Sequence, residues 1–224
     1  MDGRTVLSGE TFFFELNLFE IRSPPMAHLV RAFDQLVREG LGPGRGRANL
    51  VEVSHMGERF YDGQVYDGEI LLLTQFPSPL ELSLDHPAAP EVERLTIRFL
   101  TPTELKAEHG LAERPDFGIL ASRIRDRLST LRELYGDGPL AIDFRAFGER
   151  ASRVQMTSCR IEHVGLARRS SRTGQIHSIG GFIGEADYEG NLTEFLPYLE
   201  AAKWTGVGRQ TVWGKGTIDV AATP

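Results

Sequence analysis

The stretch "GVGRQTVWGKG", residues 206–216, joins a helix-like segment to the last β-rich segment of the chain. The preceding residues 191–203 predict a helix, and "GTIDVA" (216–221) predicts a strand. Glycine lets the backbone adopt positive φ and approach an anion with no side chain between them. Together with Arg209 and Lys215, the four glycines predict a phosphate-binding loop. The alternative is that the glycines only turn a tight helix-to-strand connection.

A similar unit lies near the amino end of the chain. A predicted strand at 11–21 is followed by a helix from Met26 to Val37, the glycine-rich "GLGPGRG" (40–46) and the predicted strand "ANLVEVSHM" (48–56). The second copy of this order begins with the predicted strand at 176–189. Repetition at this scale indicates tandem copies of one supersecondary unit.

The second copy has further elements before it. These are a strand "ERLTIRFL" (93–100), an amphipathic helix at 116–135 and a strand at 154–168. Together with the strand at 176–189, the last helix and the last strand, they give the order β-α-β-β-α-β, which is the ferredoxin-like arrangement. Weaker patterns predict strands at 69–74 and 80–84.

The predicted fold class is therefore α+β, with tandem ferredoxin-like units of which the first is incomplete. Residues 9–90 are interpreted as the C-terminal half of the first unit plus a connecting segment. Residues 91–224 are interpreted as the second, complete unit with its glycine-rich loop. Because the first copy begins at its third strand, a β-α-β half is expected upstream of Met1.

Composition indicates a soluble globular protein. The 224 residues are 41% hydrophobic and 25% charged, and the single cysteine excludes an internal disulfide or a cysteine-cluster zinc site. The amino end lacks the pattern of a signal peptide, and no apolar run reaches membrane-spanning length, so we expect a cytoplasmic protein with no membrane partner. The formal net charge of −6 disfavours nucleic acid, yet residues 160–177 hold four arginines against one acid.

Common catalytic and cofactor motifs are missing from the sequence. The spacing from Gly208 to Gly214 is one residue too long for a Walker loop, and a strand rather than a helix follows. Neither glycine-rich loop matches the dinucleotide fingerprint, and the sequence contains no G-x-S-x-G or H-E-x-x-H motif. Asp62, Asp67 and Glu69 do not follow the spacing of an EF-hand loop. We therefore expect neither a metal nor a cofactor.

The glycine pattern also supports a resemblance to a known family. A C-terminal G-h-G-x5-G-h-G loop (h, hydrophobic) between a helix and the last strand resembles the loop of the RAMP superfamily of CRISPR systems, with Lys215 at a position that is usually apolar. More narrowly, the chain resembles the precursor CRISPR RNA processing endoribonucleases. The segments that carry this resemblance are "TPTEL" (101–105), "RRSSRTGQ" (168–175) and "GGFIGEADYEGNLTEFLPYLEAAKWTGVG" (180–208). It covers residues 93–220 and, less fully, 9–56.

The resemblance implies tandem RAMP/RRM-like domains and metal-independent RNA cleavage. In such enzymes the 2′-hydroxyl attacks the adjacent phosphate and leaves a cyclic phosphate. Histidine suits the proton transfers because it titrates near neutrality. His177 and His28 are therefore the candidate catalytic residues, each with a purely structural alternative. His163 fits a sheet position better, and His55, His86 and His109 are given no role.

The same resemblance implies CRISPR repeat RNA as the partner, with other CRISPR-associated proteins as further candidates and no direct contact to DNA. Tyr188 or Trp204 is a candidate for base stacking, although Trp204 and Trp213 also fit a packed core. The candidate RNA-binding residues are the arginines and loop residues Arg168, Arg169, Arg172, Gly206, Gly208, Arg209, Gly214, Lys215 and Gly216. Two other functions stay open: a non-catalytic RAMP scaffold that binds guide RNA, and a ferredoxin-like interaction module without RNA.

Overall fold

The computed structural model of the chain divides into two compact units. Unit 1 comprises residues 1–17 and 83–224, and unit 2 comprises residues 18–82. Each unit is described by itself below. The structure describes residues 6–19, 25–42, 44–56, 61–72, 80–84, 91–165, 167–169, 173–178 and 180–223.

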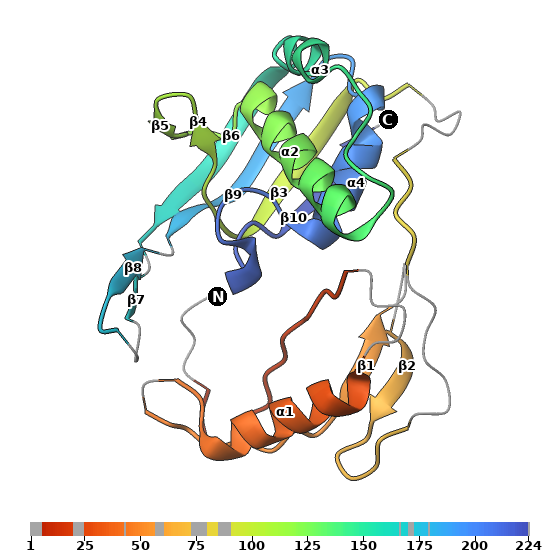
Figure 1. Cartoon of the computed structure of the whole chain (residues 1–224). Helices are drawn as coiled ribbons and strands as arrows, with labels where there is room; N and C mark the ends of the chain where they lie inside the picture. The colour runs from red at the N-terminus through yellow and green to blue at the C-terminus, as the bar shows by residue number, and fades with distance from the viewer. Residues whose placement is uncertain are drawn as a thin grey trace. The chain divides into compact units, whose positions relative to one another are not determined.

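Unit 1 contains a four-stranded sheet in which all neighbouring strands are antiparallel (Figure 1). Its strands are β3 (Arg94–Thr103), β6 (Gln155–Val164), β9 (Gly181–Glu189) and β10 (Ile218–Thr223). Their order across the sheet is β10-β3-β9-β6. The helix α2 (Phe117–Tyr135) follows β3 in the chain, and α4 (Leu196–Thr205) lies between β9 and β10. This chain order and strand order are those of a ferredoxin-like domain, so the predicted α+β fold class is confirmed.

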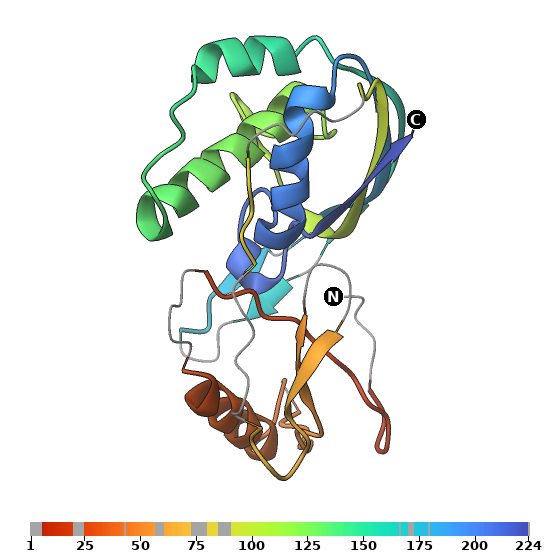
Figure 2. The same ribbon diagram turned by 90° about the vertical axis from the view of Figure 1, so that its right-hand side faces the viewer.

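The helices α2 and α4 cover one face of the sheet (Figure 2). Alternate residues of β3 point toward them, because Leu95, Ile97 and Phe99 are buried while Arg94 and Arg98 are exposed. One stripe of α2 meets this face through the buried residues Leu120, Ile124 and Leu128. The apolar period of two in the strand and of about 3.6 in the helix therefore determines the layered packing of unit 1.

The two long strands predicted at 154–168 and 176–189 are each divided in the structure. Residues 154–168 form β6 and the start of β7 (Ala167–Arg169). Residues 176–189 form β8 (Ile176–Ser178) and β9. Among the described strands, β7 and β8 pair only with each other, as a separate two-stranded hairpin.

Several short elements complete unit 1. The helix α3 (Phe144–Ala151) was not predicted, and it begins at Asp143, whose side chain accepts hydrogen bonds from the amides of Arg145 and Ala146. The strands β4 (Lys106–Ala107) and β5 (Gly110–Leu111) form a small hairpin after β3. Two short 3-10 helices are η1 (Thr193–Phe195), directly before α4, and η2 (Thr211–Trp213), inside the glycine loop.

The described residues of unit 2 form the predicted helix and two short strands. The helix α1 (Met26–Glu39) ends before Gly40, whose φ of 107° favours glycine. The strands β1 (Val53–Met56) and β2 (Tyr61–Tyr66) pair antiparallel. The strand predictions at 69–74 and 80–84 are wrong for the residues described, since Leu71 makes only an isolated bridge and 80–84 contains no strand.

The strand predicted at 11–21 is not present in the part of it that the structure describes, residues 11–19. The side chains there are largely exposed, and Phe13 reaches 81% exposure. A β-rich sequence forms a strand only where a neighbouring strand satisfies its backbone groups, and no described strand pairs with this segment. Along the described chain, no helix combines the length and the apolar character that crossing a membrane requires.

Candidate nucleic-acid interface

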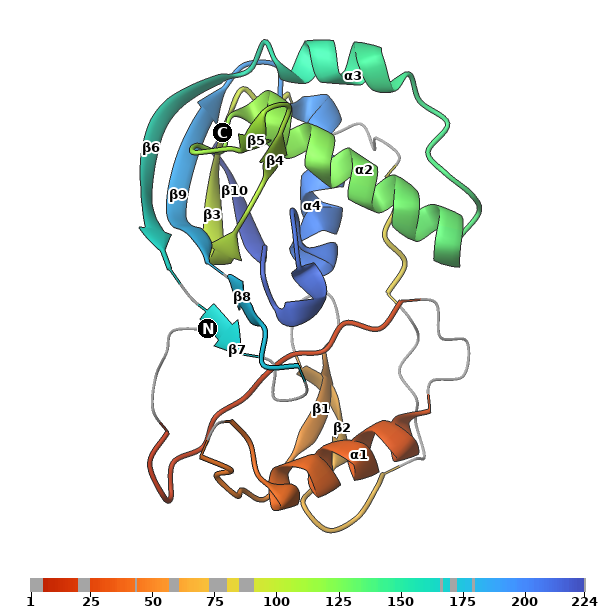
Figure 3. The ribbon, with the colours of Figure 1, turned by 60° about the vertical axis from the view of Figure 1, so that its left-hand side comes forward.

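One end of the sheet in unit 1 brings together the two basic segments that the sequence analysis singled out. Since neighbouring strands are antiparallel, the carboxyl ends of β3 and β6 lie beside the amino ends of β9 and β10. The β7–β8 hairpin joins β6 to β9 at this end, and the glycine loop leads into β10 at the same end (Figure 3). We call this region, with residues 101–104, 167–169, 173–178 and 206–217, the hairpin end of the sheet.

The β7–β8 hairpin pairs the candidate histidine with a candidate arginine. His177 on β8 lies directly opposite Arg168 on β7. Positions opposite each other in an antiparallel pair belong to one face of it. Arg169 is opposite Ile176 and belongs to the other face of the hairpin. Arg172, the third candidate of this segment, lies outside the described residues.

The glycine loop is a folded turn whose shape requires glycine at specific positions. Gly208 has φ of 86° and Gly216 has φ of 74°. A Cβ atom on Gly208 would overlap the carbonyl oxygen of Glu104, and one on Gly216 would overlap the carbonyl oxygen of Val207. These two glycines therefore allow the backbone of the loop to pack closely against the carbonyl groups of Glu104 and Val207.

The amides of three glycines in the loop are used to fold it. The Gly206 amide donates to the carbonyl of Ala202 at 2.8 Å. The amides of Gly214 and Gly216 donate to the carbonyls of Thr211 and Pro102, at 3.0 and 3.2 Å. An amide that already donates to a carbonyl is not directed at a phosphate, so these contacts support the turn-forming alternative for Gly206, Gly214 and Gly216.

The two cations of the loop meet one carboxylate, that of Glu104 at the end of β3. Arg209 Nη1 lies 2.7 Å from Glu104 Oε1, while the Arg209 side chain is 54% exposed. Lys215 is only 4% exposed, and its Nζ lies 3.0 Å from Gln210 Oε1 and 3.6 Å from Glu104 Oε2. Burial lowers the pKa of Lys215, and the charge of Glu104 opposes this shift. Contrary to its prediction as an RNA-binding residue, Lys215 is thus a buried partner of Glu104, and Arg209 is the cation that the loop presents to solvent.

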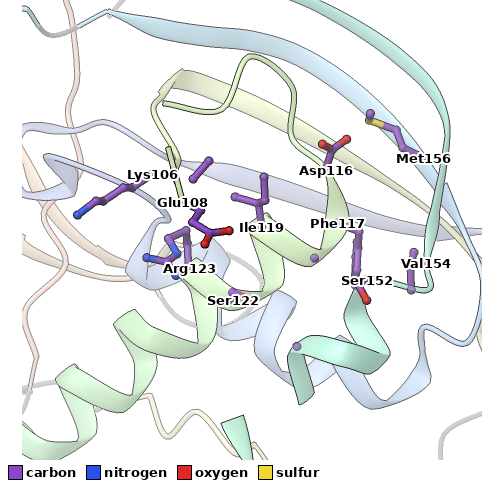
Figure 4. A pocket seen from close by; sticks show the side chains of 13 residues that line it. Lys106, Glu108, Asp116, Phe117, Ile119, Ser122, Arg123, Ser152, Val154 and Met156 are labelled. Atoms are coloured by element: carbon purple, nitrogen blue, oxygen red, sulfur yellow. The ribbon is translucent and has the colours of Figure 1, made fainter. Parts of the chain in front are cut away.

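A groove of about 850 Å³ lies elsewhere on unit 1, over the amino end of α2, α3 and the first residues of β6 (Figure 4). Its lining carries charges of both signs, with Lys106 and Arg123 against Glu108 and Asp116. This balance gives no selectivity for phosphate. Among the described residues, no group of three or more histidine, cysteine or acidic side chains is arranged to hold a metal ion.

Comparison with protein families shows which family the chain belongs to. The model of the CRISPR-associated endoribonuclease Cas6 matches residues 97–218, which is more than half of the chain. The chain belongs to the Cas6 family. The matched range begins in β3 and ends at the first residue of β10, so it covers most of the ferredoxin-like domain and both basic segments. The predicted resemblance to precursor CRISPR RNA processing endoribonucleases is confirmed.

Solved structures of Cas6 proteins are similar over part of the chain. The Thermus thermophilus Cas6 is 23% identical, with a TM-score of 0.45, over 59% of this chain and 55% of that one. A Cas6 product complex is 22% identical, with a TM-score of 0.43, over 60% and 54% of the two chains. A partial Cas6-RT-Cas1--Cas2 complex is 13% identical, with a TM-score of 0.43, over 59% and 23%. The chain spans about half the length of the first two of these Cas6 chains, and no curated protein sequence matches it.

The other histidines of this Cas6 chain are not in the hairpin. His28 is exposed in the first turn of α1, which belongs to unit 2. His163 lies near the end of β6, where its Nε2 is 3.1 Å from the carbonyl oxygen of Glu113 and its ring packs edge-on against Phe182. His55 lies on β1 and His109 in the β4–β5 turn, while His86 is outside the described residues.

The aromatic candidates are corrected by the structure. Tyr188 is buried in the core, with its hydroxyl donating to the carbonyl of Pro115 at 2.7 Å, so it is not available for base stacking. Burial also raises the pKa of the Tyr188 hydroxyl. Trp204 is half-buried at the end of α4. Trp213 in η2 is 38% exposed at the hairpin end and is the better-placed aromatic residue.

The sheet face opposite the helices differs from the stacking surface of an RRM, which carries aromatic residues. Its outward positions carry ion pairs instead. Arg160 pairs with Glu185 at 2.8 Å and with Asp187 at 3.0 Å, and Arg94 pairs with Glu189 at 3.2 Å. No aromatic residue occupies the outward positions that pair between β3 and β9. These pairs are 94 with 189, 96 with 187 and 98 with 185. The hairpin end is therefore the better candidate for RNA contact in this Cas6 chain.

Proposed function

We propose that this chain acts in the cytoplasm, binds CRISPR repeat RNA at the hairpin end of its sheet, and takes part in cutting that RNA without a metal ion. Membership of the Cas6 family supports the substrate and the reaction. The observation that carries the assignment of the site is the pairing of His177 with Arg168 across the β7–β8 hairpin. In this register, a histidine, whose imidazole can transfer protons, lies opposite an arginine, whose guanidinium stays positively charged.

The proposed reaction is an internal transesterification. The 2′-oxygen forms a bond to the adjacent phosphorus as its proton passes to a general base. The bond from phosphorus to the 5′-oxygen then breaks, and a general acid protonates that oxygen. The products are a 2′,3′-cyclic phosphate and a 5′-hydroxyl, so the protein needs two proton-transfer groups and a cation for the phosphorane.

His177 is assigned one of the two proton transfers because an imidazole can either accept or donate a proton near neutral pH. Arg168 is assigned to the phosphate that reacts, since a guanidinium donates two parallel hydrogen bonds to phosphate oxygens. Arg169 and Arg209 are assigned to neighbouring phosphates, and Trp213 to a flanking base. His28 is proposed for the second proton transfer, and other CRISPR-associated proteins are proposed as partners.

Incubation of the chain with end-labelled repeat RNA in EDTA tests this function. We expect a single cut, at the same position as with Mg²⁺ present, and a cyclic phosphate on the upstream fragment. RNA that binds but stays intact would replace this proposal with the non-catalytic RAMP scaffold. RNA that neither binds nor is cut would leave the interaction module as the function.

The arginine pair of the hairpin provides a second arm of the same test. Replacing Arg168 and Arg169 together by alanine should weaken RNA binding and lower the slope of log affinity against log salt by about one to two, because two phosphate contacts are lost. Arg145→Ala is the matched control, since Arg145 lies on α3, away from the hairpin end, and is highly exposed. Equal salt slopes in the double variant and the control would contradict the assignment of the hairpin.

A further inference from the structure

We infer that Glu104 is the positioning residue of the glycine loop, which it holds in the shape that presents Arg209 to RNA. This inference rests on the proposed RNA binding. Glu104 directly follows β3, and the glycine loop lies about 100 residues later in the chain. An acidic residue beside a phosphate-binding loop is unexpected by charge alone, because it repels the ligand.

Glu104 holds the loop through both its backbone and its side chain. Its carbonyl oxygen accepts the Arg209 amide at 3.0 Å, and a side chain at Gly208 would overlap that same oxygen. Its carboxylate lies 2.7 Å from the Arg209 guanidinium and 3.6 Å from the Lys215 ammonium. The side chains of Glu104 and Lys215 are only 12% and 4% exposed, so the ion pair between them is shielded from water, whereas the Arg209 side chain stays half exposed.

The charge of Glu104 is what allows Lys215 to stay inside the loop. A buried ammonium without a nearby opposite charge either loses its proton or moves to water. The residue that accepts a hydrogen bond from Lys215, Gln210, is neutral and has a strained positive φ of 61°. Loss of the carboxylate therefore expels or neutralises Lys215, and the backbone from 209 to 216 moves with it.

Glu104 also limits the freedom of Arg209. The guanidinium has five donors, and Glu104 accepts from one of its terminal nitrogens while half of the side chain stays exposed. An arginine held in this way loses less side-chain entropy when it binds a phosphate. Glu104 thus strengthens RNA binding because it orients Arg209, although its own negative charge repels the RNA phosphates.

The charge of Glu104 and its positioning role predict opposite changes in RNA affinity for Glu104→Gln, so this variant distinguishes between them. Simple electrostatics predicts tighter RNA binding when one negative charge is removed. We expect instead about tenfold weaker binding, because the loop loses the anchor of Lys215 and Arg209. Glu108→Gln is the matched control, since it removes the same charge from an exposed residue four positions along the chain. It should bind repeat RNA as tightly as the unmodified chain, or more tightly.

A compensating variant separates the positioning role from loss of the fold. Glu104→Gln combined with Lys215→Met removes both buried charges, and the amide oxygen of the introduced glutamine can still accept from Arg209. We expect this double variant to bind RNA within about threefold of the unmodified chain. Hydrogen exchange without RNA should show faster exchange at the amides of Arg209 and Gly216 in the single variant and near-normal exchange in the double variant.

The outcomes distinguish this inference from the proposed function. If the unmodified chain binds no RNA, the proposed function fails, whereas the exchange data still report whether Glu104 holds the loop. If the unmodified chain binds RNA and Glu104→Gln binds as tightly as Glu108→Gln, the inference is overturned. Slow exchange of the loop amides in Glu104→Gln, or failure of Lys215→Met to restore binding, would overturn it as well.

Discussion

Replacing His177 by alanine should slow cleavage of repeat RNA by about two to four orders of magnitude, the usual contribution of one general acid or base. Binding should stay within about threefold, because the phosphate contacts are assigned to arginines rather than to His177. Single-turnover cleavage with excess protein, together with a filter-binding titration of the same variant, measures the two quantities. The register that places His177 opposite Arg168 is the observation on which the assignment of His177 rests.

His109→Ala is the control for this variant. His109 lies exposed in the β4–β5 turn and is not assigned a role. It should cleave at the rate of the unmodified chain. If His177→Ala and His109→Ala cleave equally fast, the assignment of His177 is wrong.

Replacing Gly216 by alanine should cost about 2–4 kcal/mol of unfolding free energy. The residue has φ of 74°, and its new methyl group would overlap the carbonyl oxygen of Val207. The same change would also strain the hydrogen bond from the Val207 amide to the Gly216 carbonyl, which is 2.8 Å long. Urea unfolding followed by tryptophan fluorescence measures this loss, since Trp204 precedes the loop and Trp213 lies within it.

Gly214→Ala is the matched variant at the end of η2. Its φ of 81° is equally unfavourable for alanine, but a Cβ atom there would meet nothing within 4 Å. We expect a loss of only about 1 kcal/mol, from backbone conformation alone. Equal losses at Gly214 and Gly216 would contradict the close backbone approach described for the loop. A loss of RNA binding in Gly214→Ala with an intact fold would restore the direct role predicted for that glycine.

Elements of unit 1 with strong periodicity could be predicted from the sequence. The alternation in β3 and the apolar stripe of α2 each reflect one buried face, so the pattern and the element agree. The order β-α-β-β-α-β then restricts the sheet to few arrangements, one of which is β10-β3-β9-β6. In β9, alternate residues also share one face, so Tyr188 lies on the same face as the buried residues Phe182 and Ala186. The burial of Tyr188 could therefore have been predicted from the sequence in the same way.

Other features depend on partners that the sequence does not reveal locally. Residues 11–19 are β-rich but find no neighbouring strand within the described chain. The burial of Lys215 depends on Glu104, far away in the sequence, so its basic character alone indicated a surface ligand. The roles proposed for Glu104 and Trp213 were not predicted from the sequence for the same reason. Only the "TPTEL" segment and the position of the tryptophan between two loop glycines pointed to them.

The account depends on RNA lying at the hairpin end of the sheet. Photo-crosslinking with repeat RNA that contains 4-thiouridine, followed by mass spectrometry of the attached peptides, tests this location directly. We predict crosslinks within residues 167–178 and 206–217. Crosslinks confined to the ion-paired outer face of β3 and β9, or to the groove beside α2 and α3, would contradict the account.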